Sequence, residues 1–113
     1  MQIVKSSEKR EHQVGDSAVV CEYETADPTL GGATALIQGR YPAEGYVVNT
    51  RVKQLVYVLS GEGEIVTADG KREIATDDVI FIDSNEKFAW KGHMQLFLAN
   101  APRFDSSQYR KTP

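Results

Sequence analysis

The sequence predicts an all-β fold, in which antiparallel strands form a β-sandwich or close into a barrel. Short runs rich in Val, Ile, Tyr and Phe recur along the chain, and turn residues separate them about every 8–12 residues. No segment between residues 15 and 100 has a sustained helical period. Roughly nine or ten short strands would leave many exposed edges, and closure of the sheet is the simplest way to remove them.

The first part of the chain predicts two strands. Residues 1–5, MQIVK, are expected to form an edge strand, and the polar residues 6–16 are expected to wrap the surface. Residues 17–25, SAVVCEYET, predict a strand because they are rich in Val and Tyr. Within it, Cys21 is expected to be a small buried side chain, since no base that would activate its thiol is near it in the sequence.

The middle of the chain alternates strands with turns. Asp-Pro and Gly-Gly pairs predict a loop over residues 27–32. Strands are expected at 34–41 and 46–52, joined by the turn PAEG, and at 54–60, which is apolar at every position from Leu55 to Leu59. Gly61 and Gly63 predict a bend, and Asp69-Gly70 predicts a hairpin turn within residues 64–75.

Three further strands are predicted at 78–83, 87–92 and 94–99. The tail from residue 101 to residue 113 is polar and is expected to hold one helical turn, capped by Asp105 or Ser106.

Composition limits the function. The chain has 113 residues, which indicates one domain, and a net charge of −3 argues against a dedicated nucleic-acid binder. One cysteine allows no intrachain disulfide, and with no recognisable signal peptide it predicts a cytoplasmic protein. No apolar run approaches the ~20 residues that a membrane-spanning helix needs.

The order of these elements resembles the two conserved motifs of the small cupins over roughly residues 33–100. Gly45 and Gly61 match the two glycines of the first motif, and Gln54 stands where the family has a glutamate. In the second motif, Asp77 and Asp78 replace a Gly-Asp pair, Asp83-Ser84-Asn85 replaces a proline turn, and Phe88 replaces a histidine. The stretches GRYPAEGYVVN and SNEKFAW are similar to a group of small bacterial cupin-2 proteins.

The resemblance implies a jelly-roll β-barrel, also called a double-stranded β-helix, that is often dimeric. Residues 1–113 would form a single cupin domain, with the barrel at about 33–100 and the N-terminal strands and C-terminal tail packed on it. A homodimer is also expected because runs such as LVYVL and VIFI are apolar on both faces, so that one face fills the barrel and the other needs a partner.

The first motif lacks metal ligands in either strand register. Alternation from Gln54 places Thr50 and Val48 on the same face, whereas a shift of one residue places Asn49 and Arg51 there. Neither set supplies an imidazole or a carboxylate.

The histidines do not replace the missing ligands. His12 lies in a polar segment and His93 follows a glycine in a predicted turn, so both are expected at the surface. A catalytic transition-metal site needs about three His, carboxylate or Cys ligands. We therefore expect no metal or other cofactor, and the metal-dependent dioxygenase activity common among cupins is not the preferred prediction.

A barrel of this size can still enclose a small ligand. Gln54 needs a hydrogen-bond partner, which Asn49 or a ligand could supply. Phe88 either fills the space of the absent histidine and metal or contacts a ligand, and Trp90 either closes a barrel end or stacks on a ligand. Arg40 and Arg51 either lie exposed or clamp a carboxylate or phosphate. The predicted ligand-binding residues are Arg40, Asn49, Thr50, Arg51, Gln54, Phe88 and Trp90.

Three functions remain open. The preferred prediction is a metal-free cupin that binds a small molecule. The second is an enzyme, a dioxygenase or an isomerase, with an unusual metal site or a pocket of Tyr, Arg and Gln. Metal-free sugar epimerases of similar fold use a histidine and a tyrosine, and Tyr41, Tyr46 and Tyr57 supply only the tyrosine. The third is a structural or interaction module whose barrel is packed shut.

Overall fold

The computed structural model covers residues 1–113, and strands form most of the chain. Two short 3-10 turns are the only helical segments: η1 (Ser6–Glu8) and η2 (Ser106–Gln108). The strands are β1 (Arg10–Val14), β2 (Ala18–Tyr23), β3 (Gly31–Tyr41), β4 (Tyr46–Asn49), β5 (Lys53–Thr67), β6 (Gly70–Ala75), β7 (Val79–Ile82), β8 (Lys87–Ala101) and β9 (Tyr109–Thr112). No helix is long or apolar enough to cross a bilayer.

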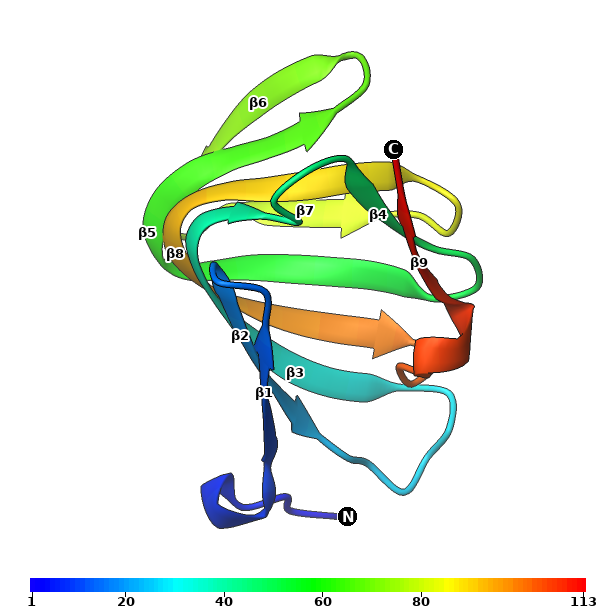
Figure 1. Cartoon of the computed structure of the whole chain (residues 1–113). Coiled ribbons are helices and arrows are strands. Elements are labelled where there is room, and N and C mark those ends of the chain that lie inside the picture. The colour runs from blue at the N-terminus through cyan, green and yellow to red at the C-terminus, as the bar shows by residue number, and fades with distance from the viewer.

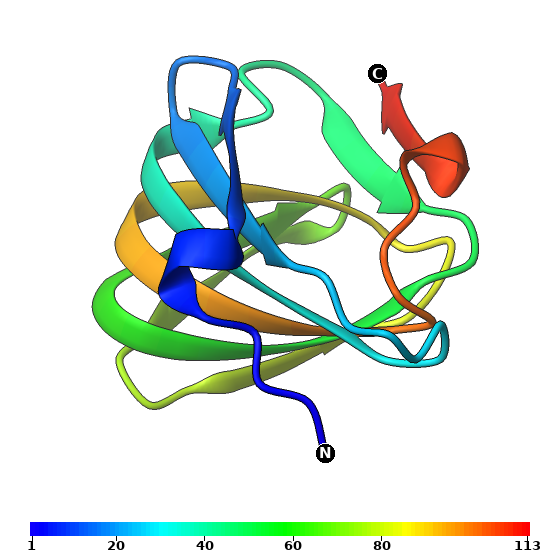
Figure 2. The same ribbon diagram turned by 90° about the horizontal axis from the view of Figure 1, so that it is seen from below.

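All strand pairs are antiparallel, and β8 lies at the centre of the sheet. One edge of β8 pairs with β3, beyond which lie β2 and β1, and the other edge pairs with β5, which also carries β6 and β7. The start of β8 pairs with β4, which in turn pairs with β9. The sheet curls strongly, and β4 and β9 lie on the opposite side of the molecule from the bend in β5 and β8 (Figures 1 and 2).

Three glycines lie side by side where the central strands bend. Gly92 of β8 pairs with Gly39 of β3 on one side and with Gly63 of β5 on the other. Gly92 has a φ of 139°, and a Cβ there would lie 2.5 Å from the Cα of Gly63. The backbones therefore approach more closely than any side chain would allow, and the sheet can turn sharply at this row.

Alternating side chains divide the curled sheet into an inner and an outer face. In β5, Val56 and Val58 are fully buried, whereas Leu55 and Tyr57 are exposed on the outer face. The same alternation continues in β8, and the inward side chains of seven strands form one hydrophobic cluster. Alternate residues of a strand point to opposite faces of the sheet, so every second side chain faces inward. These inward side chains form the core and border the cavity described below.

The predicted strand at residues 1–5 was wrong, whereas the following polar residues 6–16 lie at the surface, as expected. Residues 1–5 form no strand, and Met1 and Ile3 are exposed. The polar segment predicted to wrap the surface contains β1, because Arg10 to Val14 pair with β2 along an edge where polar side chains can face solvent. Cys21 is buried, as expected.

Two predicted breaks are absent. The strands expected at 54–60 and 64–67 are one strand, β5, with a bulge between Val58 and Ser60. The strands expected at 87–92 and 94–99 are likewise one strand, β8, so His93 lies within a strand and not in a turn. Gly61 and Gly63, which predicted a bend, lie within β5, and Gly92 lies within β8, so these glycines allow the strands to bend without ending them.

In the tail, the 3-10 turn is capped by Asp105, whose side chain accepts a hydrogen bond from the backbone N–H of Ser107, as predicted. The strand that follows, β9, was not predicted. Its sequence, YRKT, has no apolar alternation, and pairing with β4 decides its conformation.

Candidate functional site

A cavity of about 340 Å³ lies inside the curled sheet. Its wall is largely apolar, and β3 contributes the small side chains of Ala33 and Ala35, which alternate on the inner face. Leu98 of β8 and Val20 of β2 lie on the same wall. The alanines leave space where larger side chains would complete the core, so the interior is not packed shut.

A pair of buried amides lies on the cavity wall. Gln54 of β5 and Asn100 of β8 are opposite each other in the strand register, and they are 7% and 3% exposed. Gln54 Nε2 donates a hydrogen bond of 2.9 Å to Asn100 Oδ1. The prediction that Asn49 could be the partner of Gln54 was therefore wrong, because Asn49 belongs to β4 and bonds elsewhere.

Two tyrosines form a second polar pair on the wall. The hydroxyl oxygens of Tyr41 and Tyr109 are 2.9 Å apart and share a hydrogen bond. Burial, together with this bond, raises the pKa of Tyr109 far above that of a free tyrosine. Phe104 packs edge-on against Tyr109, with ring centroids 5.7 Å apart. Because Tyr109 stays protonated, it can donate or accept a hydrogen bond but cannot act as a base at neutral pH.

Phe88 and Trp90 lie at the start of β8 and both border the cavity. Both are buried, and their rings meet edge to face with centroids 5.5 Å apart. Phe88 also belongs to the hydrophobic cluster, so it fills core volume and forms part of the wall at once. Trp90 is the only tryptophan of the chain, which makes it a natural fluorescent reporter of the cavity.

Charged side chains surround the cavity mouth. His12 Nε2 lies 3.8 Å from Glu22 Oε2, and the His12 side chain is 52% exposed. Arg10 forms ion pairs of 3.6 Å with Glu22 and 3.4 Å with Glu24. A polar hollow of about 560 Å³ adjoins the mouth and shares these residues. His12 is thus exposed, as expected, but it faces the cavity entrance.

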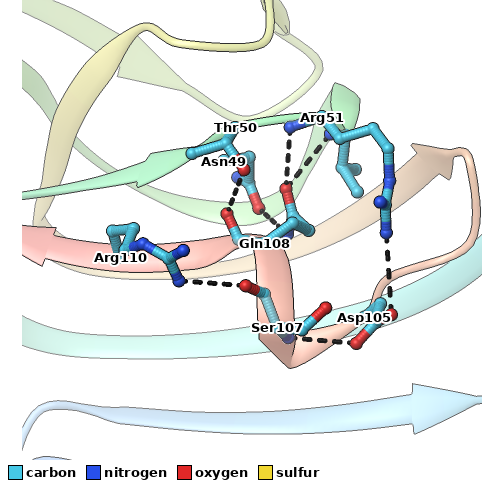
Figure 3. A network of polar contacts seen from close by, with 8 residues as sticks. Asn49, Thr50, Arg51, Asp105, Ser107, Gln108 and Arg110 are labelled. Atoms are coloured by element: carbon cyan, nitrogen blue, oxygen red, sulfur yellow. Dashed lines mark hydrogen bonds and ion pairs between the residues drawn. The ribbon is translucent and has the colours of Figure 1, made fainter.

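Asn49, Thr50 and Arg51 do not border the cavity. Asn49 is 2% exposed and accepts a hydrogen bond of 2.8 Å from Gln108 Nε2 (Figure 3). Thr50 Oγ1 donates to the backbone oxygen of Gln108, and Gln108 Oε1 accepts from the backbone N–H groups of Arg51 and Val52. These hydrogen bonds hold the C-terminal segment against the end of β4 and the link between β4 and β5.

The structure decides the register that the sequence left open. Asn49 points inward with Val47, while Thr50 and Arg51 are exposed. The link between β4 and β5 interrupts the alternation, so Gln54 also points inward. Arg51 lies at the outer hollow and pairs with Asp105 at 3.6 Å, and the N–H of Ser107 lowers the pKa of the Asp105 carboxyl (Figure 3).

Arg40 is held by the turn that follows β3. Its guanidinium donates to the backbone oxygens of Pro42 and Gly45 and lies 5.9 Å from the ring centroid of Tyr46. Arg40 does not border the cavity, so its place in the fold does not support the predicted clamp on an anion.

The cavity residues that were not among the predicted ligand contacts include His12, Tyr41, Asn100 and Tyr109. A signal for Asn100 was present, because Met94, Leu96 and Leu98 alternate and Asn100 is the next residue on their face. Tyr41 follows the same rule from Ala33 and Ala35, whereas nothing in the sequence places Tyr109 or His12 at the cavity.

Comparison with known proteins identifies the fold. Neither a protein-family model nor a curated protein sequence matches the chain. The nucleoside dehydratase Pac13 of Streptomyces superposes with a TM-score of 0.87 over 99% of this chain and 91% of its own, at 19% identity. The polyketide cyclase RemF of Streptomyces resistomycificus gives 0.78 over 100% and 86%, at 12% identity. An RmlC-like cupin from Shewanella frigidimarina gives 0.73 over 91% and 92%, at 16% identity.

The fold is that of a cupin. The predicted jelly-roll barrel is therefore confirmed. Gln54 and Phe88 stand at two positions where the sequence resemblance expects metal ligands, and both border the cavity. An amide oxygen is a weak ligand for transition metals and a phenyl ring is none.

The donor set of this cavity does not fit a transition metal. No group of three or more His, Cys, Asp or Glu side chains is close enough to hold an ion. His12 has Glu22 beside it, but these two supply fewer ligands than a catalytic site needs. The cavity instead offers hydrogen-bonding amides, phenols and an apolar wall.

Proposed function

We propose that this cupin binds a small organic molecule in the inner cavity and needs no metal to do so. The observation that carries the proposal is an open cavity whose apolar wall is interrupted by two buried polar pairs, Gln54–Asn100 and Tyr41–Tyr109. A few fixed polar groups on an apolar wall are typical of small-molecule sites, and about 340 Å³ lies in their usual size range.

The structural neighbours support a ligand that combines a ring with polar groups. One neighbour is a nucleoside dehydratase, and a variant of the same Streptomyces protein with uridine superposes with a TM-score of 0.88, at 18% identity over 100% of this chain and 92% of its own. Another is a polyketide cyclase. The charged mouth with Arg10 and Glu22 would receive the more polar end of such a ligand.

Binding can be tested through the fluorescence of Trp90. We expect at least one member of a panel of nucleosides, sugars and aromatic acids to change this fluorescence with saturation. Ala33→Leu should abolish the change by filling the cavity, and Thr34→Leu, on the outer face of the same strand, should not. Binding that survives Ala33→Leu would show that the ligand lies elsewhere.

The proposal that binding needs no metal is tested by a separate measurement. We expect elemental mass spectrometry of protein purified without chelator or metal-affinity resin to find every transition metal well below stoichiometry. Near-stoichiometric iron, manganese, nickel or zinc would contradict the proposal and would favour an oxygenase-like activity.

An acid–base enzyme is the second candidate. The observation in its favour is His12, the only histidine at the cavity, whose Nε2 lies 3.8 Å from Glu22 Oε2. The Tyr41 and Tyr109 hydroxyls could donate hydrogen bonds to a leaving group. If the protein removes water from a nucleoside or sugar, mass spectrometry should detect the loss of water with the wild type, and His12→Gln should abolish turnover while binding remains.

A homodimer is proposed on the basis of the outer apolar face, a group of exposed side chains on β3, β5, β7 and β8. Strand register places Leu55 beside Phe81, and Tyr57 between Val79 and Phe97. Its members are Leu36, Leu55, Tyr57, Val79, Phe81 and Phe97. A continuous apolar patch of this kind is typical of protein interfaces. The proposed partner is a second copy of this chain.

We further infer a cytoplasmic location and no role in nucleic-acid binding. A single free cysteine, Cys21, and a net charge of −3 support these two inferences.

A further inference from the structure

The amide pair on the cavity wall is fixed in place by its strands. Gln54 and Asn100 project from directly opposed positions of β5 and β8, and their side chains are joined by a 2.9 Å hydrogen bond. Both are more than nine-tenths buried, and both border the cavity. Their remaining polar groups are therefore held in one orientation before any ligand arrives.

The internal bond uses only part of what the two amides offer. It occupies an N–H of Gln54 and the oxygen of Asn100. Gln54 Oε1 and Asn100 Nδ2 have no partner within the chain, and neither is among the fully enclosed unpaired atoms, of which Asn49 Nδ2 is the only one. The free oxygen and the free NH₂ group thus keep access to the cavity.

This result does not depend on which way the amides are turned. If both were flipped, Asn100 would donate to Gln54, and the free groups would be the Asn100 oxygen and the Gln54 NH₂. In either orientation the pair offers one acceptor and one donor to the cavity.

We propose that Gln54 and Asn100 recognise an amide or imide edge of a planar ring, in which a ring N–H stands next to a ring carbonyl. The N–H would donate to the free amide oxygen and the carbonyl would accept from the free NH₂. This assignment depends on the ligand binding proposed above and adds the chemical class of the ligand. A carboxylate fits less well, because it only accepts and would leave the free oxygen unpaired.

The rest of the wall favours a ring. Ala33 and Leu98 lie one inward position along the strands from the amide pair, and Phe88 and Trp90 border the same cavity. A flat ring can bury both faces against such apolar and aromatic groups while its edge meets the amides.

Uridine and 3-methyluridine test this assignment, because the methyl group replaces the ring N–H and leaves the carbonyls in place. Titrations would follow Trp90 fluorescence in the wild type and in the double variant Gln54→Leu/Asn100→Leu. We expect the wild type to bind uridine at least about tenfold more tightly than 3-methyluridine, which corresponds to one lost buried hydrogen bond. In the double variant we expect this preference to disappear. Ala33→Leu and Thr34→Leu serve as the filled-cavity variant and its control.

Equal affinity of the two nucleosides for the wild type would overturn the assignment, as would an unchanged preference in the double variant. If neither nucleoside binds but other panel members do, and Ala33→Leu abolishes their binding, the amide recognition fails while the proposed binding function stands. If no binding depends on the cavity, both proposals fail.

Discussion

At the scale of single residues, the cavity depends on polar side chains that satisfy each other. Gln54 and Asn100 share a hydrogen bond in a buried place, and so do Tyr41 and Tyr109. Removal of one member leaves the other without a partner, which costs more than the bond itself contributes. The two members of each pair should therefore behave as a coupled unit.

We predict that Asn100→Leu lowers the free energy of unfolding by about 1–3 kcal/mol, because the Gln54 amide loses its partner in a buried place. Gln54→Leu/Asn100→Leu should recover much of that loss, since two apolar side chains can replace the pair. Urea denaturation of the wild type, both single variants and the double variant gives the coupling energy. A coupling near zero would show that the two amides act independently.

Tyr109 should make stability depend on alkaline pH. Its pKa is raised in the folded state, chiefly by burial, above the ~10 of the unfolded chain. Its contribution to stability is complete below about pH 10 and is lost as pH rises toward the folded pKa, at no more than about 1.4 kcal/mol per pH unit. Urea denaturation at about pH 8 and about pH 11 should show a smaller loss for Tyr109→Phe than for the wild type.

Tyr46→Phe is the control for this experiment, because it keeps the Tyr41–Tyr109 bond. An equal loss of stability in the wild type and Tyr109→Phe would mean that Tyr109 does not contribute to the alkaline loss.

At the scale of elements, β8 organises the sheet and its glycine sets the curvature. Gly92 contacts Gly63 of β5 so closely that an added Cβ would lie 2.5 Å from the Gly63 Cα. Gly70 in the hairpin has a similar φ of 131°, but an added Cβ would meet nothing within 4 Å. At both positions a residue with a Cβ would be strained, but the space around them differs.

We predict that Gly70→Ala costs about 1–2 kcal/mol of stability through strain alone. Gly92→Ala should cost about 1–3 kcal/mol more, since β5 and β8 must move apart. Chemical denaturation of both variants measures the difference. Similar losses would indicate that close packing at the bend contributes little.

The C-terminal segment is attached to the rest of the fold through Gln108. Its amide bonds Asn49 and two backbone N–H groups, and its neighbours Phe104, Ser106 and Tyr109 border the cavity. The tail is thus an integral part of the cavity wall.

We predict that Gln108→Ala lowers the free energy of unfolding by about 2–4 kcal/mol, because it leaves buried groups of β4 and the following loop unpaired. Arg110→Ala is the matched control, because the Arg110 side chain is exposed and donates only to the backbone oxygen of Ser107 (Figure 3). Arg110→Ala should change the free energy of unfolding by no more than about 0.5 kcal/mol. Thermal and urea denaturation would measure both, and equal losses would contradict the role of Gln108.

At the scale of the whole molecule, the curled sheet has two apolar faces. The inner one forms the core and the cavity wall, and the outer apolar face is exposed to solvent. A charged substitution on an interface is strongly unfavourable, whereas on a free surface it has little effect.

We predict that the wild type sediments as a homodimer and that Phe81→Lys, which places a charge on the β7 part of the outer apolar face, sediments as a monomer. Analytical ultracentrifugation over a range of concentrations distinguishes the two. Lys71→Glu, on the β6 hairpin outside that face, is a charge-changing control. A monomeric wild type would contradict the proposed dimer.

The sequence by itself determined most strands, as short runs of β-branched and aromatic residues between turn residues, and with them the fold class. The runs at 55–59 and 79–82 are apolar at every position and rich in Val, Ile, Tyr and Phe, a preference that local geometry alone explains. The same local rules identified the cap at Asp105 and the hairpin at Asp69-Gly70. The resemblance to cupin motifs also located Gln54, Phe88 and Trp90, which border the cavity.

Only the tertiary structure decided which polar groups meet. Gln54 pairs with Asn100, 46 residues away, Tyr41 with Tyr109, 68 residues away, and Asn49 with Gln108, 59 residues away. The polar strand β1 and the tail strand β9 also carry no local signal, because their conformation comes from neighbours on the sheet. Hydrogen bonding between distant side chains depends on how the sheet curls, and no periodicity in the sequence encodes that curvature.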